Sequence, residues 1–103
     1  NGLKAMDATA CGKIMGPVAA RWESFGWHAR ELDGHDMAQL CDALDWAEAD
    51  AEAPCVIIAH TVKGKGVSFL EGRPEFHNAA LTPEQITAAL AELEATLQAL
   101  REA

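Results

Sequence analysis

The sequence predicts an α/β fold with a parallel sheet and flanking helices, and three observations support this. Residues 27–32 alternate as a strand does, residues 55–60 have the continuous apolar character of a buried strand, and the helical pattern of residues 37–51 lies between them. A strand, a helix and a second strand in that order form a right-handed crossover, which makes the two strands parallel neighbours. With one helix before them and one after residue 82, two strands and three helices are expected.

The first helix is expected to follow Pro17, because proline suits the first turn of a helix. Apolar side chains then recur at the i, i+4 and i+7 positions of one helix face: Val18, Trp22 and Phe25. Gly26 can close this helix as a C-terminal cap. Residues 1–16 show no clear periodicity and predict an irregular segment.

The second helix is expected to begin after Asp36, which stands in the N-cap position with Gln39 three residues later. Four residues are predicted to face inward: Leu40, Cys41, Leu44 and Ala47. Four acidic residues are predicted to face water: Asp42, Asp45, Glu48 and Asp50. The dipeptide at 53–54 ends the helix, and the apolar residues 55–60 are typical of a central parallel strand.

Residues 61–81 predict a long loop, and loops of that length in compact domains are often functional. The last helix, within 82–103, has Thr82 as N-cap, proline at the first helical position and Gln85 at the third. Its apolar stripe consists of Ile86, Leu90, Leu93, Leu97 and Leu100. We expect this stripe to pack against the body of the protein or against a partner.

Composition excludes several classes of protein. The chain has 103 residues, half of them hydrophobic, and a formal net charge of -8. Nonspecific binding to nucleic acid or to an anionic membrane normally requires a basic face, so neither is expected. No apolar run approaches the roughly 20 residues of a membrane-spanning helix. The composition is that of one soluble domain or part of one.

Three cysteines, Cys11, Cys41 and Cys55, occur without a CxxC motif. This odd number and uneven spacing argue against a disulfide framework or a zinc site and favour a reducing, cytoplasmic setting. The first residue is Asn rather than Met, so the chain is expected to be a fragment that lacks its N-terminal part.

The most informative motif is His-Thr-Val-Lys-Gly-Lys-Gly at residues 60–66, which follows the apolar run 55–59 and precedes Phe76, His77 and Asn78. Glycines in such a loop allow positive φ and a close approach of the backbone to a ligand. Two lysines and a histidine add donors for an anion. The motif therefore predicts an anion-binding loop after a buried strand.

Together with Asn-Gly-Leu at residues 1–3 and Asp-Gly-His-Asp at residues 33–36, this loop resembles the diphosphate-binding domain of transketolases, including those split into two subunits. The resemblance is strongest from residue 59 to residue 77. It implies that residues 1–103 are the C-terminal part of a single diphosphate-binding domain, with residues 61–81 as the active-site loop. It also implies thiamine diphosphate and Mg²⁺ (or Ca²⁺) as cofactors.

By the same resemblance, Asn1 and the Leu3 carbonyl are two ligands of the divalent ion, a hard cation that prefers oxygen. The alternative for Asn-Gly is a simple turn. His77 is the expected catalytic residue and is expected beside the diphosphate, although the family commonly has His-Gly where this chain has His77 and Asn78. The alternative for His77 is a surface loop histidine. Lys63 is expected near the phosphates or across a subunit boundary, and the alternative is a solvated lysine.

The other three histidines, His28, His35 and His60, are expected to be structural. Trp22, Trp27 and Trp46 are expected in the core or at an interface. The Asp-Gly-His-Asp motif is expected to form a strand-to-helix turn with a helix cap.

The implied activity is transfer of a two-carbon ketol unit from a ketose phosphate to an aldose phosphate, as in the pentose phosphate pathway. The resemblance implies that the isolated fragment is inactive and works with the rest of its domain and a pyrimidine-binding domain or C-terminal subunit, in a homodimer or heterotetramer. Two alternatives remain open: a 1-deoxyxylulose-5-phosphate synthase-like enzyme, and a noncatalytic assembly module that retains the fold.

Overall fold

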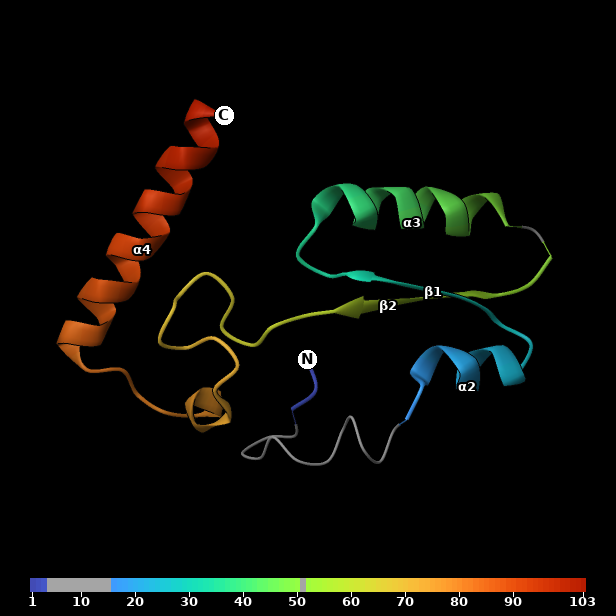
Figure 1. Ribbon diagram of the computed structural model, residues 1–103, viewed down its shortest axis with the longest axis horizontal. Helices are drawn as coiled ribbons and strands as arrows, with labels where there is room; N and C mark the ends of the chain where they lie inside the picture. The colour runs from blue at the N-terminus through green and yellow to red at the C-terminus, as the bar shows by residue number, and fades with distance from the viewer. Residues whose placement is uncertain (4–15, 51) are drawn as a thin grey trace. The chain divides into compact units, whose positions relative to one another are not determined.

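The computed structural model describes residues 1–3, 16–50 and 52–103 of the chain (Figure 1). Predictions on residues 4–15, among them Cys11, lie outside these ranges. The chain divides into two compact units. We call Gly12–Thr61 the sheet unit, and Asn1–Cys11 with Val62–Ala103 the loop-helix unit. The fold class is α/β, as the sequence predicts.

Two parallel strands form the centre of the sheet unit. Strand β1 covers His28–Asp33 and β2 covers Cys55–His60, in a register that pairs His28 with Cys55 and Asp33 with His60. Helix α3, Met37–Ala49, connects them, so the predicted crossover is confirmed. Helices α2 and α3 lie on opposite sides of the strand pair (Figure 1).

Helix α2 covers Val18–Ser24, and only its C-terminal end agrees in detail with the sequence prediction. Pro17 is the N-cap rather than the first helical residue, because its ψ of 101° is extended. Gly26 has the expected positive φ of 84°, and its N–H donates to the Glu23 carbonyl at 2.9 Å. The predicted glycine cap is therefore confirmed. Trp22 and Trp27 place their rings 4.7 Å apart beside it.

Helix α3 begins at the predicted cap. The Asp36 carboxylate accepts the N–H of Gln39 at 3.1 Å and the side-chain amide of Gln39 at 2.8 Å. The Gln39 amide oxygen in turn accepts the N–H of Asp33 at 3.2 Å. The reciprocal bond of this capping arrangement thus reaches back to the end of β1 and fixes the strand-to-helix turn.

The prediction for the inward face of α3 is partly wrong. Ala43 is completely buried, whereas Leu44 is 61% exposed and Cys41 is also exposed. The buried face runs through Leu40, Ala43 and Ala47 at spacings of three and four residues. A small residue at its centre allows the helix to approach the strands closely. A pattern that gives weight to large apolar side chains therefore selects Leu44 in error.

The loop-helix unit contains the turns of residues 62–72, the 3-10 helix η1 at Pro74–His77 and helix α4 at Pro83–Glu102. The predicted capping box of α4 is present. The Thr82 hydroxyl accepts the Gln85 N–H at 3.2 Å, and the Gln85 side chain accepts the Thr82 N–H at 2.9 Å. This reciprocal pair explains why α4 begins where the sequence indicates.

Few large side chains are buried in the described residues. The buried apolar residues are Leu32, Ala43, Val67 and Ala89. By contrast, the predicted apolar stripe of α4 is between 46% and 71% exposed, with Ile86, Leu90, Leu93, Leu97 and Leu100 as its members. Among residues 1–3, 16–50 and 52–103, no helix has the length and apolar character needed to span a membrane.

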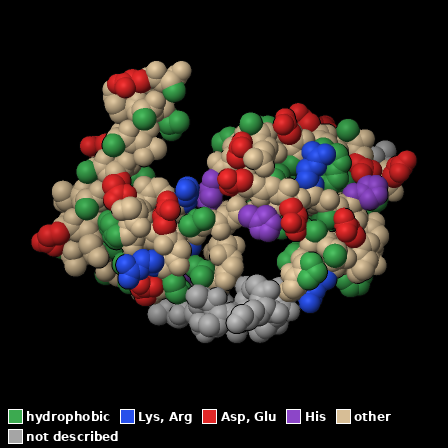
Figure 2. Space-filling view, viewed as in Figure 1, with side chains coloured by type: hydrophobic (Ala, Val, Ile, Leu, Met, Phe, Trp, Pro, Cys, Tyr) green, Lys and Arg blue, Asp and Glu red, His purple; other side chains and the backbone are tan. Residues whose placement is uncertain are grey.

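Acidic side chains recur over both α3 and α4 on the face shown in Figure 2. This distribution agrees with the net charge of -8.

Candidate transketolase site

The 62–72 segment folds back on itself as a closed loop. The Gly72 N–H donates to the Lys63 carbonyl at 2.8 Å, and the Val67 N–H donates to the Gly64 carbonyl at 3.2 Å. Gly64 has a φ of 72°, and a Cβ on it would lie 2.6 Å from the Leu70 carbonyl oxygen. The expected close backbone approach at a glycine is thus present, and the approaching group is another part of the same loop.

Two carboxylates accept hydrogen bonds from this loop. Glu71 accepts the Gly66 N–H at 3.0 Å and lies 3.6 Å from the Lys65 ammonium. Glu92, on α4, accepts the N–H of Ser68 at 2.6 Å and its hydroxyl at 2.7 Å. These side chains hold the loop in shape and attach it to α4. An anion that used the Gly66 N–H would have to displace Glu71.

Ser68 controls the ionisation of Glu92. Its N–H and its hydroxyl both donate to the carboxylate, and together they hold the pKa of Glu92 below the ordinary value of 4.5. Since the folded-state pKa is the lower one, this contact stabilises the fold fully above pH 4.5. The stabilisation is lost as the pH falls through the lowered pKa of the folded state.

We therefore expect Glu92→Gln to reduce the protection of the Ser68 amide against hydrogen exchange at pH 7, because the neutral amide accepts these bonds more weakly. The difference between variant and wild type should shrink as the pH falls below 4.5. Glu94→Gln on the same helix is the matched control, since Glu94 is exposed, and it should leave the Ser68 amide unchanged. Equal protection in wild type and Glu92→Gln at pH 7 would contradict the assignment.

His77 is exposed and is the last residue of η1. The turn before it is packed by aromatic and ionic contacts. Phe69 and Phe76 meet edge to face at 6.2 Å, and the Arg73 guanidinium lies 5.6 Å from the centre of the Phe76 ring while donating to Glu75 at 2.6 Å. These contacts fix the backbone at the residue before His77 and leave the imidazole open to solvent. Such a placement suits a group that must reach a substrate.

Asn78 follows His77 with φ of -147° and ψ of 43°. This conformation lies outside the left-handed region, so the position does not require glycine. The departure from the family's His-Gly therefore has no steric consequence at this position. Lys63, half-buried at the start of the loop, forms no ion pair with the described residues. It remains a candidate for a phosphate, in contrast to Lys65.

The Asp-Gly-His-Asp motif at residues 33–36 forms the predicted strand-to-helix turn. The Asp33 carboxylate accepts the His35 N–H at 2.9 Å, and the Gly34 N–H donates to the His60 carbonyl at 2.7 Å. A Cβ on Gly34 would lie 2.7 Å from the Thr61 side chain. The glycine is therefore required by the close approach of the chain that leaves β2.

Comparison with known proteins identifies the family. Residues 4–97 match the family described as transketolase, thiamine diphosphate binding domain. The chain belongs to this transketolase family. The resemblance predicted from the sequence is thereby confirmed, and membership of the family implies thiamine diphosphate as a ligand.

Individual transketolases match over most of the chain. A 6-deoxy-6-sulfo-D-fructose transketolase subunit of Clostridium sp. (strain MSTE9) is 42% identical over 78 residues, which are 76% of this chain and 28% of that protein. One of the apulose-4-phosphate transketolase subunits of Actinobacillus succinogenes is 39% identical, over 75% of this chain and 28% of its own length. Human transketolase is 35% identical over 76% of this chain and 12% of its own. The chain thus spans less than a third of these transketolases.

The residues expected to hold the metal of a transketolase site have suitable donor chemistry. The Asn1 side-chain oxygen accepts the Leu3 N–H at 3.0 Å across Gly2, which has a φ of 68°. The Asn-Gly turn of the alternative interpretation is therefore present. It does not conflict with metal binding, because an amide oxygen has a second lone pair. Together with the Leu3 carbonyl it offers two neutral oxygen ligands of the kind that Mg²⁺ and Ca²⁺ accept.

One arrangement in this transketolase domain differs from the sequence prediction. Asp50 is predicted to face water, but its side chain is only 13% exposed and its Oδ2 contacts His28 Nδ1. This contact lowers the pKa of Asp50 to about 2 and raises that of His28 above 6.5. His28 is thus paired, consistent with its predicted structural role. Sequence periodicity misses the pair because Asp50 lies past the last turn of α3, where the chain leaves the helical geometry.

Proposed function

We propose that the chain is part of a larger thiamine diphosphate-dependent transketolase, which transfers a two-carbon ketol unit between a ketose phosphate and an aldose phosphate. The observation that carries this proposal is the family match over residues 4–97. The relatives described above are transketolases, which supports ketol transfer over a deoxyxylulose-phosphate synthase activity. Two of them are single subunits, which supports a split enzyme with a separate second subunit.

Each candidate residue has a role that its position allows. The Asn1 side-chain oxygen and the Leu3 carbonyl would hold the Mg²⁺ or Ca²⁺ ion that anchors the diphosphate. The Lys63 ammonium would neutralise phosphate charge. The exposed His77 imidazole would exchange protons with a substrate hydroxyl or carbonyl, because histidine accepts and releases protons near neutral pH. Thiamine diphosphate, when bound, supplies the carbanion stabilisation that amino-acid side chains lack.

The isolated chain of 103 residues is expected to bind thiamine diphosphate negligibly. Two neutral oxygen ligands without a carboxylate hold a divalent cation weakly. A ligand that contacts several segments of a larger protein gains only part of its binding free energy from one of them. Calorimetry with thiamine diphosphate in the presence and absence of Mg²⁺ tests this. Micromolar, Mg²⁺-dependent binding by the chain alone would contradict the expectation.

The function itself is tested on the native assembly that contains this chain, purified with the proteins that accompany it. Ketol transfer is measured with several ketose and aldose phosphates, with and without added thiamine diphosphate and Mg²⁺. Transfer that depends on both additions supports the proposal. An assembly that neither binds thiamine diphosphate nor transfers a ketol unit would reject it.

A noncatalytic assembly module is the second candidate, and one observation favours it. Five large apolar side chains of α4 are between 46% and 71% exposed along one stripe, which is a surface suited to a protein contact. The same native assembly distinguishes the two functions. A module would remain associated through α4 while the assembly shows no cofactor-dependent activity.

A further inference from the structure

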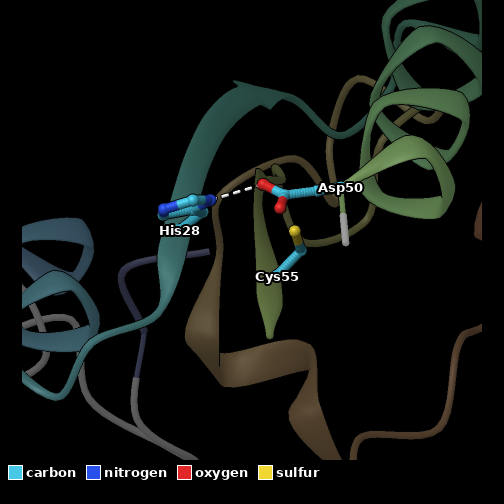
Figure 3. Close-up of side chains that lie close together, drawn as sticks. All are labelled: His28, Asp50 and Cys55. Carbon is cyan, nitrogen blue, oxygen red and sulfur yellow. Dashed lines mark hydrogen bonds and ion pairs between the residues drawn. The ribbon is translucent and has the colours of Figure 1, made fainter. Parts of the chain in front are cut away.

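Three side chains that can bind metals converge at one end of the strand pair in the sheet unit (Figure 3). His28 begins β1, Cys55 begins β2, and Asp50 is the C-cap residue that follows α3. One ligand atom of each residue lies within 4.8 Å of the other two. The close-up shows the three groups pointing toward a common point between the strands and the helix end.

The backbone holds two of these residues side by side. His28 and Cys55 are direct partners in the parallel register, so their side chains leave the same face of the sheet. The His28 N–H also donates to the Pro54 carbonyl at 3.0 Å, which fixes the start of β1 against the residue before β2. An imidazole and a thiol are therefore kept adjacent by the sheet itself.

Asp50 is held by separate contacts. Its Oδ1 accepts the N–H of Glu52 at 2.9 Å and that of Ala53 at 3.4 Å. Its own N–H donates to the Trp46 carbonyl at 3.2 Å. With Oδ1 occupied by the turn after α3, Oδ2 is directed at His28. The carboxylate is thus positioned before any ligand binds.

The Cys55 thiol is the third group of the cluster. It is half-buried, hydrogen-bonds to the Asp50 carboxylate and has a weak contact to the Ala53 carbonyl at 3.7 Å. Imidazole nitrogen, thiolate sulfur and carboxylate oxygen together form a ligand set typical of Zn²⁺ rather than of Mg²⁺ or Ca²⁺, which prefer oxygen alone. Spacing along the chain does not predict this set, because the fold brings its members together.

We propose that His28, Asp50 and Cys55 bind one Zn²⁺ ion, with the fourth position open to water. Zinc bonds of about 2.0–2.3 Å place the ligand atoms roughly 3–4 Å from one another, so the His28 imidazole must turn away from Asp50 Oδ2 to admit the ion, while Asp50 keeps its Oδ1 contacts. The His28 side chain is 47% exposed, which provides a path from solvent. Binding would release the Cys55 thiol proton to solvent.

The first test uses the full chain, stripped of metal by a chelator and titrated with zinc sulfate in a calorimeter. One ion per chain is expected. Cys55→Ser should weaken binding by more than about 100-fold, because even the loss of a group that only supports a ligand costs about 10- to 100-fold. Cys41→Ser is the matched control, since Cys41 lies on the exposed side of α3, and it should bind like the wild type.

A second test identifies the sulfur directly. The double variant Cys11→Ser, Cys41→Ser leaves Cys55 as the single cysteine of the chain. Co²⁺ bound to this variant should show the near-ultraviolet charge-transfer absorption of a cobalt thiolate. Asp50→Asn keeps an oxygen for the Glu52 and Ala53 N–H groups while it removes the charge, and it should bind zinc more weakly.

These variants keep the proposal open to refutation even if Cys55→Ser fails to fold. Absence of stoichiometric zinc binding by the wild-type chain would overturn it. So would zinc binding without a thiolate signal in the single-cysteine variant, or an unchanged affinity in Asp50→Asn.

Discussion

Replacing Gly64 with alanine is expected to destabilise the 62–72 loop by about 2–5 kcal/mol. Two physical terms contribute. Alanine at a φ of 72° must adopt the left-handed conformation, which costs roughly 1–2 kcal/mol. The new Cβ would also lie 2.6 Å from the Leu70 carbonyl oxygen, a backbone atom that cannot rotate away, and such overpacking costs about 1–3 kcal/mol.

Gly72→Ala is the matched control for this prediction. Its φ of 68° is nearly the same, but no atom lies within 4 Å of the added Cβ. Only the conformational term of roughly 1–2 kcal/mol is expected at this position. Hydrogen exchange of the residue 72 amide, which donates to the Lys63 carbonyl, measures the free energy of loop opening in both variants. Equal destabilisation by the two substitutions would show that the approach of Leu70 has no energetic importance.

His77→Ala is expected to lower kcat of the proposed transketolase assembly by about 100- to 10,000-fold, the range that a positioned proton-transfer group contributes. The imidazole is exposed, and the packed 3-10 turn before it fixes its backbone position. The substitution should leave that turn intact, because Phe69, Phe76 and Arg73 hold it without the histidine. The decrease should therefore appear in kcat while the assembly still forms.

His60→Gln is the control for this experiment. His60 is also an exposed histidine, at the end of β2, and its contact with Glu31 at 3.5 Å is a surface ion pair of small energetic importance. Its kcat should remain near that of the wild type. The dependence of kcat on pH adds a second measurement for His77→Ala, since loss of a proton-transfer group should remove one limb of that pH profile. An unchanged kcat in His77→Ala would remove His77 from the proposed mechanism.

The sequence predicts the order and type of the three α-helices and two strands described above, because each carries its own local signal. The Asp36 and Thr82 caps are decided by side chains within three residues of the helix start, and both are present. The predictions of burial fail where a side chain packs against a segment that is distant in the sequence. The sequence predicts that Leu44 lies on the buried face of α3, but Ala43 is the buried residue there. The short distance between the helix and the sheet decides which side chain fits.

The same division holds for the candidate site. The family resemblance in residues 59–77 identifies the loop and the exposed His77 from sequence. The sequence does not predict that two backbone donors of the loop, at Gly66 and Ser68, are already occupied. Their N–H groups are bound to Glu71 and Glu92, and Glu92 lies on α4, 24 residues after Ser68.

By itself, then, the sequence determined the α/β class, the helix caps and the transketolase resemblance, because these depend on periodicity and on contiguous motifs. Only the tertiary structure decided which donors of the loop are already bound, which face of α3 is buried, and that His28, Asp50 and Cys55 meet. Parallel strand pairing places residues that are distant in the chain next to each other, as in the pair His28 and Cys55. The order of the elements predicts that the strands are parallel neighbours, but no local pattern gives the register that places His28 opposite Cys55.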